Sequence, residues 1–399
     1  MSTEASHIRA LIRTLPLSRG NYGGMLQAYA LQQALAALGV EADTDVSYAM
    51  PRDTMIRAAI LRAKGRVVPR PMRPVEVDDA RRRPMVTRFL DRHVSTVSIY
   101  DPFGRLRPQR LEGYDAFITG SDQVWRKRYG MLASYFFDFL SADDARIRVS
   151  YAASFGKHPS HEYTAEDVAV VGGLLERFTA VGVREHEAVD QVSELWGIEA
   201  THNVDPVMLL DASRYREIAG GPAFESPELA RQRGDAPAHA FTYVLDPREE
   251  LSRVTAAAAA EASVPEVRLP LKQPTSVAEY NSSPSRFALP HLEDWLRGFI
   301  GADYVVTDSF HGTVLSILLH KPFVSLVNQD RGADRFHTLA ALPGLADRFL
   351  DPTQLIEGEG AATIGRLVDT EIDWSAVDAA VSKLRADSVE FLARGLGLD

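Results

Sequence analysis

Short apolar runs rich in β-branched and aromatic residues alternate along this chain with longer stretches of helical periodicity. In the first half the strand-like runs fall at 10–15, 116–119, 147–153, 179–183 and 201–204. In the second half they fall at 241–245, 266–269, 304–307 and 323–327. Such alternation is typical of parallel strands, because each pair of parallel strands needs a crossover connection, usually a helix. The pattern therefore predicts an α/β fold with two doubly wound halves.

Composition places the boundary between the halves. We expect a first domain over residues 1–210, which includes a basic insertion at 51–110. Residues 211–240 are rich in glycine, proline and charged side chains and are interpreted as a linker. Residues 241–370 are expected to form the second domain, and a last helix over about 373–394 carries apolar residues on one stripe.

The segment Thr307-Asp308-Ser309-Phe310-His311-Gly312-Thr313 places an imidazole where a strand turns into a helix. The preceding 304–307 reads as a buried strand, and the apolar stretch that follows ends before Pro322. The first turn of a helix offers backbone N–H groups and partial positive charge, and Gly312 would let a ligand approach them. Two interpretations stay open at this point: an anion site with a proton donor, or a capping turn whose histidine only packs.

A second strand, glycine loop and helix is expected at residues 10–39. Asn21-Tyr22-Gly23-Gly24 forms the loop, and Ala28, Leu31, Leu35 and Leu38 would form one buried stripe of the helix before Gly39 ends it. The glycine pair is too short to be a dinucleotide fingerprint.

Six motifs together resemble the polysaccharide pyruvyl transferase family. They are Asn21-Tyr22-Gly23-Gly24, Gly120-Ser121-Asp122-Gln123, Ser150-Tyr151-Ala152-Ala153, Val183-Arg184-Glu185, Asp205-Pro206 and Thr307-Asp308-Ser309-Phe310-His311-Gly312. The resemblance implies a GT-B-like enzyme, with two Rossmann-like domains facing a central cleft and residues 371–399 packing back on the first. It also implies transfer of a pyruvyl group from phosphoenolpyruvate onto sugar hydroxyls as a ketal, with phosphate released and no cofactor.

The donor carries a carboxylate and a phosphate, which bind to arginines and helix N-termini. Arg184 matches an arginine of the family and is the first candidate, while Arg331 and Arg335 compete for a second basic position. The expected donor residues are Arg184, Ser309, Gly312, Thr313, Arg331 and Arg335. Near neutral pH a histidine can act as an acid, so His311 is expected either to protonate the donor or to stabilise the departing phosphate.

A general base for the sugar hydroxyl is harder to choose, and Asp122 is the leading candidate. Asp205 and Asp308 are interpreted as residues that hold backbone turns. The expected acceptor residues are Asn21, Tyr22, Gly23, Gln27, Ser121 and Gln123. Two other classes remain: a glycosyltransferase that uses a nucleotide sugar, and a non-catalytic member of the family. Fold alone does not separate them.

The chain has 399 residues, a formal net charge of −10 and no cysteine. Thiolate chemistry, disulfides and cysteine-based metal sites are therefore excluded. No His-Glu-x-x-His occurs, and Asp43-Thr44-Asp45 is interpreted as a solvated strand entry, so we expect no metal. The first 20 residues lack the apolar core of a signal peptide, which favours a cytoplasmic protein.

Residues 51–110 hold 15 basic against 6 acidic side chains. This segment could contact the inner face of a membrane or the diphosphate of a lipid-linked sugar, or it could be a solvated loop broken by prolines. Nucleic acid is not an expected partner, because the rest of the chain is acidic and no recognition module is present.

Overall fold

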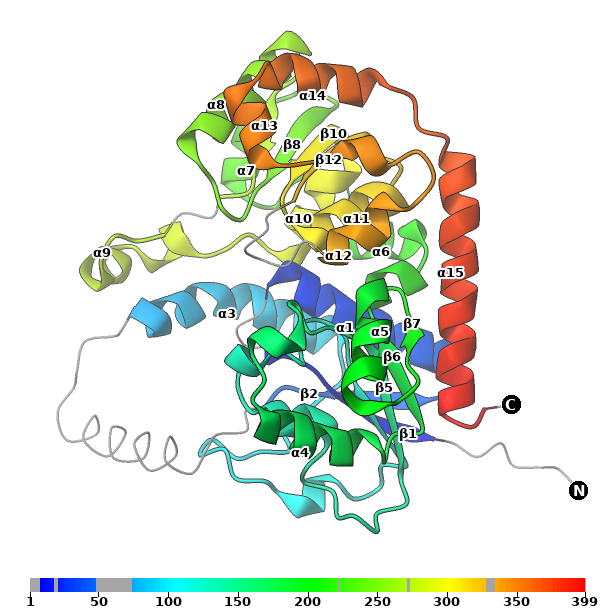
Figure 1. The fold of residues 1–399 in the computed structure, drawn as a ribbon. Helices are drawn as coiled ribbons and strands as arrows, with labels where there is room; N and C mark the ends of the chain where they lie inside the picture. Colours follow the sequence, from blue (N-terminus) through cyan, green and yellow to red (C-terminus); the bar gives the residue numbers. More distant parts are fainter. Residues whose placement is uncertain are drawn as a thin grey trace, which may run out of the picture. The chain divides into compact units, whose positions relative to one another are not determined.

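The structure, a computed structural model, describes residues 8–17, 21–47, 74–221, 223–270, 273–327 and 334–398. Its chain divides into two compact units. Unit 1 comprises Met1–Leu209, Pro274–Arg286 and Arg385–Asp399, and unit 2 comprises Leu210–Gln273 and Phe287–Leu384. Each unit has a parallel sheet of its own (Figure 1).

The sheet of unit 1 has the strand order β3-β2-β1-β4-β5-β6-β7, and every neighbouring pair is parallel. The strands are β1 (Arg9–Arg13), β2 (Glu41–Asp45), β3 (Thr96–Val97), β4 (Ala116–Thr119), β5 (Ile147–Ala153), β6 (Ala180–Val183) and β7 (Thr201–His202). The order reverses between β1 and β4. Open α/β sheets bind ligands beyond the carboxyl ends of the strands at such a reversal, so the loops after β1 and β4 are the first place to look.

In the described part of unit 1 five helices accompany this sheet, besides the end of the last helix. They are α1 (Tyr22–Ala37), α3 (Pro74–His93), α4 (Ala165–Leu175), α5 (His186–Trp196) and α9 (Val277–Ser282), with 3-10 turns η2 (Pro108–Arg110), η3 (Lys127–Tyr129), η4 (Leu132–Phe136), η5 (Pro159–His161) and η6 (Pro206–Leu209). In α1 the predicted stripe of Ala28, Leu31 and Leu35 is buried, but Met25 and Gln32 are buried too. Leu38, the C-cap residue, is only partly buried. The predicted stripe is thus largely confirmed, but the helix is buried over more than this one stripe.

The sheet of unit 2 has the order β12-β11-β10-β8-β9, again parallel throughout, and it reverses between β8 and β10. Its strands are β8 (His239–Tyr243), β9 (Glu266–Arg268), β10 (Ala302–Thr307), β11 (Phe323–Leu326) and β12 (Phe349–Leu350). The expectation of an α/β protein with two doubly wound halves is confirmed by these two sheets. A GT-B-like facing of the halves across a cleft stays a prediction.

Helices surround this second sheet as well, and the pair α8 and α14 packs together (Figure 1). The helices are α6 (Ala212–Ala219), α7 (Pro227–Arg233), α8 (Glu249–Glu261), α10 (Leu292–Ile300), α11 (Phe310–Leu318), α12 (Asp334–Ala340), α13 (Pro352–Glu357) and α14 (Gly360–Asp369), with η7 (Pro284–Phe287) and η9 (Ala346–Arg348) as 3-10 turns. The long last helix α15 (Trp374–Gly395) is divided: its residues from Arg385 onward belong to unit 1.

Apolar clusters hold each unit together. In unit 1 Trp125 stacks on Phe136 with ring centroids 4.9 Å apart, inside a cluster closed by α4 and α5. In unit 2 Val306 of β10 and Val324 of β11 pack with Ile364 of α14. Strands buried on both faces read as continuous apolar runs, which is why most of them could be recognised in the sequence.

The predicted linker at 211–240 is wrong. This stretch contains α6, α7 and the start of β8, and α6 packs against α10 while α7 packs against β9. Glycine and proline mark helix ends here, since Gly220 and Gly234 follow α6 and α7 and Pro227 begins α7.

The basic segment at 51–110 is not one loop-like insertion in its described part. Residues 51–73 lie outside the described residues, but 74–110 contain α3, β3 and η2, and β3 pairs with β2 in the sheet. Pro84 lies within α3. Arg81 is buried and pairs with Asp78, whereas Arg83 is exposed.

Strand β2 escaped the sequence analysis, and Asp45 within it is not solvated as expected. Asp45 is buried and forms an ion pair with Arg13, which lies opposite it in the register of β1 and β2. The guanidinium of Arg13 also lies 5.0 Å from the ring centres of Tyr100 and Tyr135. The sequence of β2, Glu-Ala-Asp-Thr-Asp, is unusually polar for a strand. It is stabilised by Arg13, which comes near only when the sheet forms.

Candidate active site

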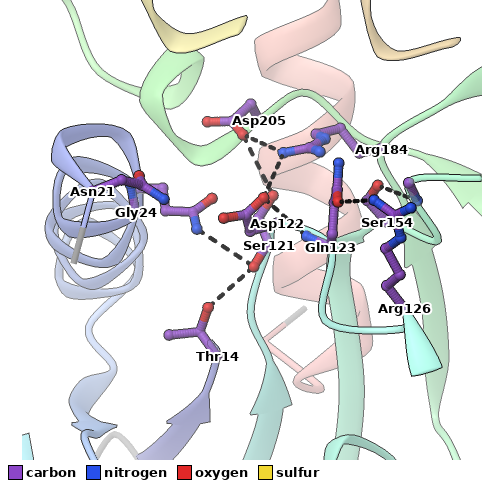
Figure 2. Close-up of polar contacts among 12 residues, drawn as sticks. Thr14, Asn21, Gly24, Ser121, Asp122, Gln123, Arg126, Ser154, Arg184 and Asp205 are labelled. Carbon is purple, nitrogen blue, oxygen red and sulfur yellow. Dashed lines mark hydrogen bonds and ion pairs between the residues drawn. The ribbon is translucent and has the colours of Figure 1, made fainter. Parts of the chain in front are cut away.

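The loops that follow β1 and β4 meet at the reversal point of the first sheet. Thr14, just after β1, donates from Oγ1 to the carbonyl oxygen of Ser121 at 3.1 Å, and Gln27 of α1 approaches the same oxygen with Nε2 at 3.5 Å. Ser121 donates from Oγ to Asp205 Oδ2 at 3.4 Å (Figure 2). Residues that follow β1, β4 and β7 therefore share one polar cluster with Gln27 of α1 at this edge.

Helix α1 begins at this edge with a side-chain cap. Asn21 is the N-cap residue, and its Oδ1 accepts from the backbone N–H of Gly24. The side chain of Asn21 leaves little room beside Gly24, where a Cβ would lie 3.2 Å from Oδ1. Asn21 is exposed, whereas Tyr22 and Gly23 are buried. Of these three predicted acceptor residues, Asn21 is the one placed to meet a ligand.

Arg184, which follows β6, lies among three carboxylates. Its Nη1 is 3.1 Å from Asp205 Oδ2 and 3.9 Å from Asp122 Oδ1, and its Nε is 3.3 Å from Glu185 Oε1. The Arg184 side chain is only 3% exposed and that of Asp205 is fully buried. Burial alone would lower the pKa of Arg184, but the carboxylates of Glu185, Asp205 and Asp122 together raise it above its usual value.

This geometry changes the interpretation of Arg184. Among the described residues one guanidinium faces three carboxylates, and this surplus of negative charge disfavours an anionic donor there. The predicted role of Arg184 as an open receptor for the donor does not fit this arrangement. It fits the counter-ion of a carboxylate cluster, which suits a neutral ligand that donates hydrogen bonds from hydroxyls.

Sequence analysis named Glu185 in a motif without giving it a role, and it gave Asp205 only half of its role. Asp205 does hold a turn, since its Oδ1 accepts from the backbone N–H of Val207 at 3.0 Å, but its Oδ2 binds Arg184. Both carboxylates follow the ends of neighbouring strands, β6 and β7, and that position was the available signal.

Asp122, the predicted base, has a backbone φ of +78°. This left-handed conformation is unfavourable for a residue with a Cβ, although aspartate tolerates it better than most. Its Oδ1 accepts from the N–H of Gln123 at 2.9 Å, and the carboxylate points toward Arg184 (Figure 2). The turn thus directs a partly exposed carboxylate into the cluster.

Gln123, a predicted acceptor residue, serves the structure instead. Its Oε1 accepts from Arg126 Nη1 at 3.1 Å, and its side chain fills the space where a Cβ on Gly156 would lie 2.6 Å from Cδ. The prediction of a direct acceptor contact does not fit this buried position.

In unit 2 the loops after β8 and β10 meet at the reversal point of the second sheet. Asp308 bridges them, because it accepts from the backbone N–H groups of Leu245 at 2.7 Å and Asp246 at 3.0 Å. The expected role of Asp308 in holding the backbone fits these contacts. Ser309 follows as the N-cap of α11, and its Oγ accepts from Gly312 N–H at 3.2 Å.

Two predicted donor residues of this turn point into the protein. A Cβ on Gly312 would lie 2.5 Å from Thr307 Oγ1, so the glycine lets α11 pack closely on β10 and does not open the backbone to a ligand. Thr313 is fully buried, and its Oγ1 lies 2.8 Å from Ser325 Oγ of β11. Gly312 and Thr313 are therefore structural, and Ser309 is mainly a helix cap.

His311 lies in the first turn of α11 and is 9% exposed. The ring of Phe310 meets the His311 ring at an interplanar angle of 84° with centroids 5.4 Å apart. The Arg335 guanidinium of α12 lies 6.0 Å from the centre of the same Phe310 ring. The imidazole of His311 and the guanidinium of Arg335 thus each lie beside the Phe310 ring. Arg331, the competing candidate, lies outside the described residues.

Comparison with known proteins shows the family of this chain. Residues 21–330, most of the chain, match the polysaccharide pyruvyl transferase family. The chain belongs to that family. The matched region begins at the α1 cap and includes both sheet edges with Asp122, Arg184 and His311, so the resemblance seen in the motifs is confirmed, and the protein is a transferase. No curated protein matches the chain.

Several solved structures resemble this transferase in outline at low sequence identity. UDP-GlcNAc 2-epimerase from Neisseria meningitidis bound to UDP-GlcNAc has 10% identity and a TM-score of 0.45, covering 96% of this chain and 100% of its own. An S. aureus MnaA–UDP structure has 12% identity and a TM-score of 0.49, covering 95% and 96%. The glycosyltransferase SnogD from Streptomyces nogalater has 14% identity and a TM-score of 0.43, covering 97% and 96%. The fold assignment therefore rests on the sheet topology above.

Two further observations bear on partners of this transferase. Among the described residues no group of three or more histidine, aspartate or glutamate side chains is placed to hold a metal ion. In the same part of the chain, no helix is both long and apolar enough to cross a membrane.

Proposed function

We propose that the protein transfers the pyruvyl group of phosphoenolpyruvate onto two hydroxyls of a sugar in a cell-surface polysaccharide or its precursor. The observation that carries the proposal is the contrast between the two sheet edges. In unit 2 His311 of α11 and Arg335 of α12 each lie beside the Phe310 ring, whereas the cluster around Arg184 in unit 1 is rich in carboxylates. A cationic edge suits an anionic donor, and a carboxylate edge suits hydroxyl donors.

The proposed chemistry assigns one proton transfer to each edge. His311 protonates the methylene carbon of phosphoenolpyruvate, and a sugar hydroxyl attacks the adjacent carbon as Asp122 takes the hydroxyl proton. The bond from that carbon to the phosphate oxygen then breaks and phosphate leaves. The second hydroxyl attacks the same carbon and closes the ketal, and its proton passes to the released phosphate. The donor phosphate and carboxylate are assigned to Arg335, whose planar guanidinium suits both groups.

Gln27 supports a hydroxyl-bearing ligand at the carboxylate edge. Its side chain is 2% exposed, and within the described residues its Oε1 accepts no hydrogen bond. An unsatisfied buried carbonyl is costly, and a hydroxyl at this edge would satisfy it. Together with Asn21 and Ser121, Gln27 is assigned to the acceptor.

The decisive experiment is incubation of the protein with phosphoenolpyruvate and a panel of sugar acceptors. We expect phosphate release matched by an acceptor mass gain of pyruvate minus water. The His311→Ala variant should lose turnover by about 10² or more, the usual scale for a general acid. His320→Ala, just beyond the far end of α11, is the matched control and should remain active. Turnover with a nucleotide sugar and none with phosphoenolpyruvate would favour the glycosyltransferase alternative instead.

A further inference from the structure

The carboxyl-terminal half of α15 holds the backbone segment that carries Asp205. Ser388 Oγ accepts from the backbone N–H of Val204 at 3.1 Å, and Arg385 donates from Nε to the carbonyl oxygen of Met208 at 2.8 Å. Asp205 lies between these two anchored residues. Ser388 is 1% exposed, so its hydrogen bond is shielded from water.

A buried tyrosine completes this anchor from the sheet. Tyr151 of β5 donates from its hydroxyl to the carbonyl oxygen of Val204 at 2.9 Å. Burial raises the pKa of Tyr151 well above its usual value, so the hydroxyl keeps its proton and stays a donor. The peptide groups on the two sides of Val204 are thus each held, one by α15 and one by β5.

The same half of α15 also contacts the strand that carries Arg184. A Cβ on Gly182 of β6 would lie 2.0 Å from Asn203 Oδ1, 2.7 Å from the Ser150 carbonyl oxygen and 2.8 Å from Phe391 Cε1. The missing side chain therefore leaves room for these neighbours and for the helix. Gly395 of α15 likewise allows a close approach to the start of β6, because a Cβ on Gly395 would lie 3.1 Å from Ala180 Cβ. The same helix therefore supports both the strand that precedes Arg184 and the segment that contains Asp205.

We propose that Arg385 and Ser388 are positioning residues of this enzyme, which act through Asp205 to hold Arg184 and the carboxylate edge in place. Without their two hydrogen bonds the 204–208 segment would keep its chain connection but lose its fixed position, and the 3.1 Å contact between Asp205 and Arg184 would loosen. The family match ends at residue 330, so these two residues lie outside it. The kinetic part of this proposal rests on the proposed function, and the part on Arg184 does not.

The kinetic test compares Ser388→Ala and Arg385→Ala with Leu392→Ala, which truncates a fully buried apolar side chain of the same helix and breaks neither hydrogen bond. We expect each polar variant to lower kcat about five- to tenfold, with little change in the KM for phosphoenolpyruvate. Arg385→Lys should restore part of the loss. In the Asp205→Asn background Ser388→Ala should cost little more, because both act through one pair.

A second measurement does not depend on the reaction. Side-chain arginine NMR, with the Arg184 signal assigned by its loss in Arg184→Lys, reports the exchange rate of the Nη1 protons that face Asp205. We expect Ser388→Ala to speed this exchange about tenfold or more and Leu392→Ala to leave it nearly unchanged. Unchanged exchange in Ser388→Ala would overturn the proposal even if the enzyme transfers no pyruvyl group. Additive kinetic effects of Asp205→Asn and Ser388→Ala, or equal losses of kcat in Leu392→Ala, would also overturn it.

Discussion

Asp122 shows how a single residue can be unfavourable for folding and useful for chemistry. Its φ of +78° places a side-chain-bearing residue in the left-handed region, at a cost of roughly 1 kcal/mol. That backbone turn is what directs the carboxylate toward Arg184. A residue chosen for stability alone would be glycine or asparagine.

The first prediction follows from this conflict. Asp122→Asn should keep the fold and its free energy of unfolding, and Asp122→Gly should raise that free energy by up to about 1 kcal/mol. Both variants should lose turnover by about 10² or more, because neither can accept a proton. Denaturant unfolding and initial rates measure the two effects. An active Asp122→Asn enzyme would exclude this residue as the base.

Arg184 allows a second test at the same scale. If it is the counter-ion of Asp205, Glu185 and Asp122, then Arg184→Met leaves buried carboxylates without their cation. We expect a loss of about 3–5 kcal/mol in the free energy of unfolding, as is usual when one partner of a buried ion pair is removed. An arginine kept only for donor binding would cost affinity and little stability, so a stable Arg184→Met protein would restore the original interpretation.

At the scale of elements, the contact of α11 with β10 explains a glycine that the sequence analysis assigned to ligand binding. Thr307 Oγ1 donates to the carbonyl oxygen of Tyr243 at 2.7 Å and occupies the space beside Gly312. We expect Gly312→Ala to destabilise the protein by about 1–3 kcal/mol through overpacking. Thr307→Ala should absorb part of that loss, so the double variant should be less destabilised than the sum of the singles. Strict additivity, measured by denaturant unfolding, would contradict the packing explanation.

In helix α3 two arginines close in sequence differ in burial. Arg81 is buried beside Asp78, and its burial lowers its pKa, whereas Arg83 is exposed. The two arginines are therefore not equivalent members of one basic surface. Arg81→Ala should destabilise the fold by about 1–3 kcal/mol, and Arg83→Ala should stay within about 0.5 kcal/mol of the wild type. Equal changes in the free energy of unfolding for the two variants would contradict a structural role for the buried Arg81.

For the whole molecule, the sequence predicted the structure correctly where local patterns determine it. It failed where residues distant in the sequence come into contact. Strand β5 was predicted residue for residue, since its run is mostly β-branched, aromatic or small and is buried after Ile147, with Arg148 as the one charged residue. Strand β2 was missed because its polar sequence makes sense only beside Arg13, 32 residues away. The turn around His311 was placed correctly at a sheet edge, but the inward direction of Gly312 and Thr313 depends on β10 and β11. Local sequence locates an edge, whereas packing decides which side chains face it.

The last prediction concerns the pH dependence of the whole fold. His239 in unit 2 is fully buried, its Nε2 donates to the Gly298 carbonyl oxygen at 2.9 Å, and burial lowers its pKa to about 4. Burial, followed by the stacked ring of His186 at 3.8 Å, likewise lowers the pKa of His202 to about 4. In the unfolded chain both titrate near 6.5, so at pH values below about 6.5 the unfolded state binds protons that the folded state refuses. The free energy of unfolding should therefore be flat with pH above this value and fall by about 3 kcal/mol per histidine as the pH drops to 4.

His239→Gln should remove about half of this fall and the His202→Gln/His239→Gln double variant most of it, even if both proteins are less stable at pH 7. If denaturant unfolding at pH 7 and pH 4.5 gives the double variant the same difference as the wild type, these two histidines are not the groups that refuse the protons.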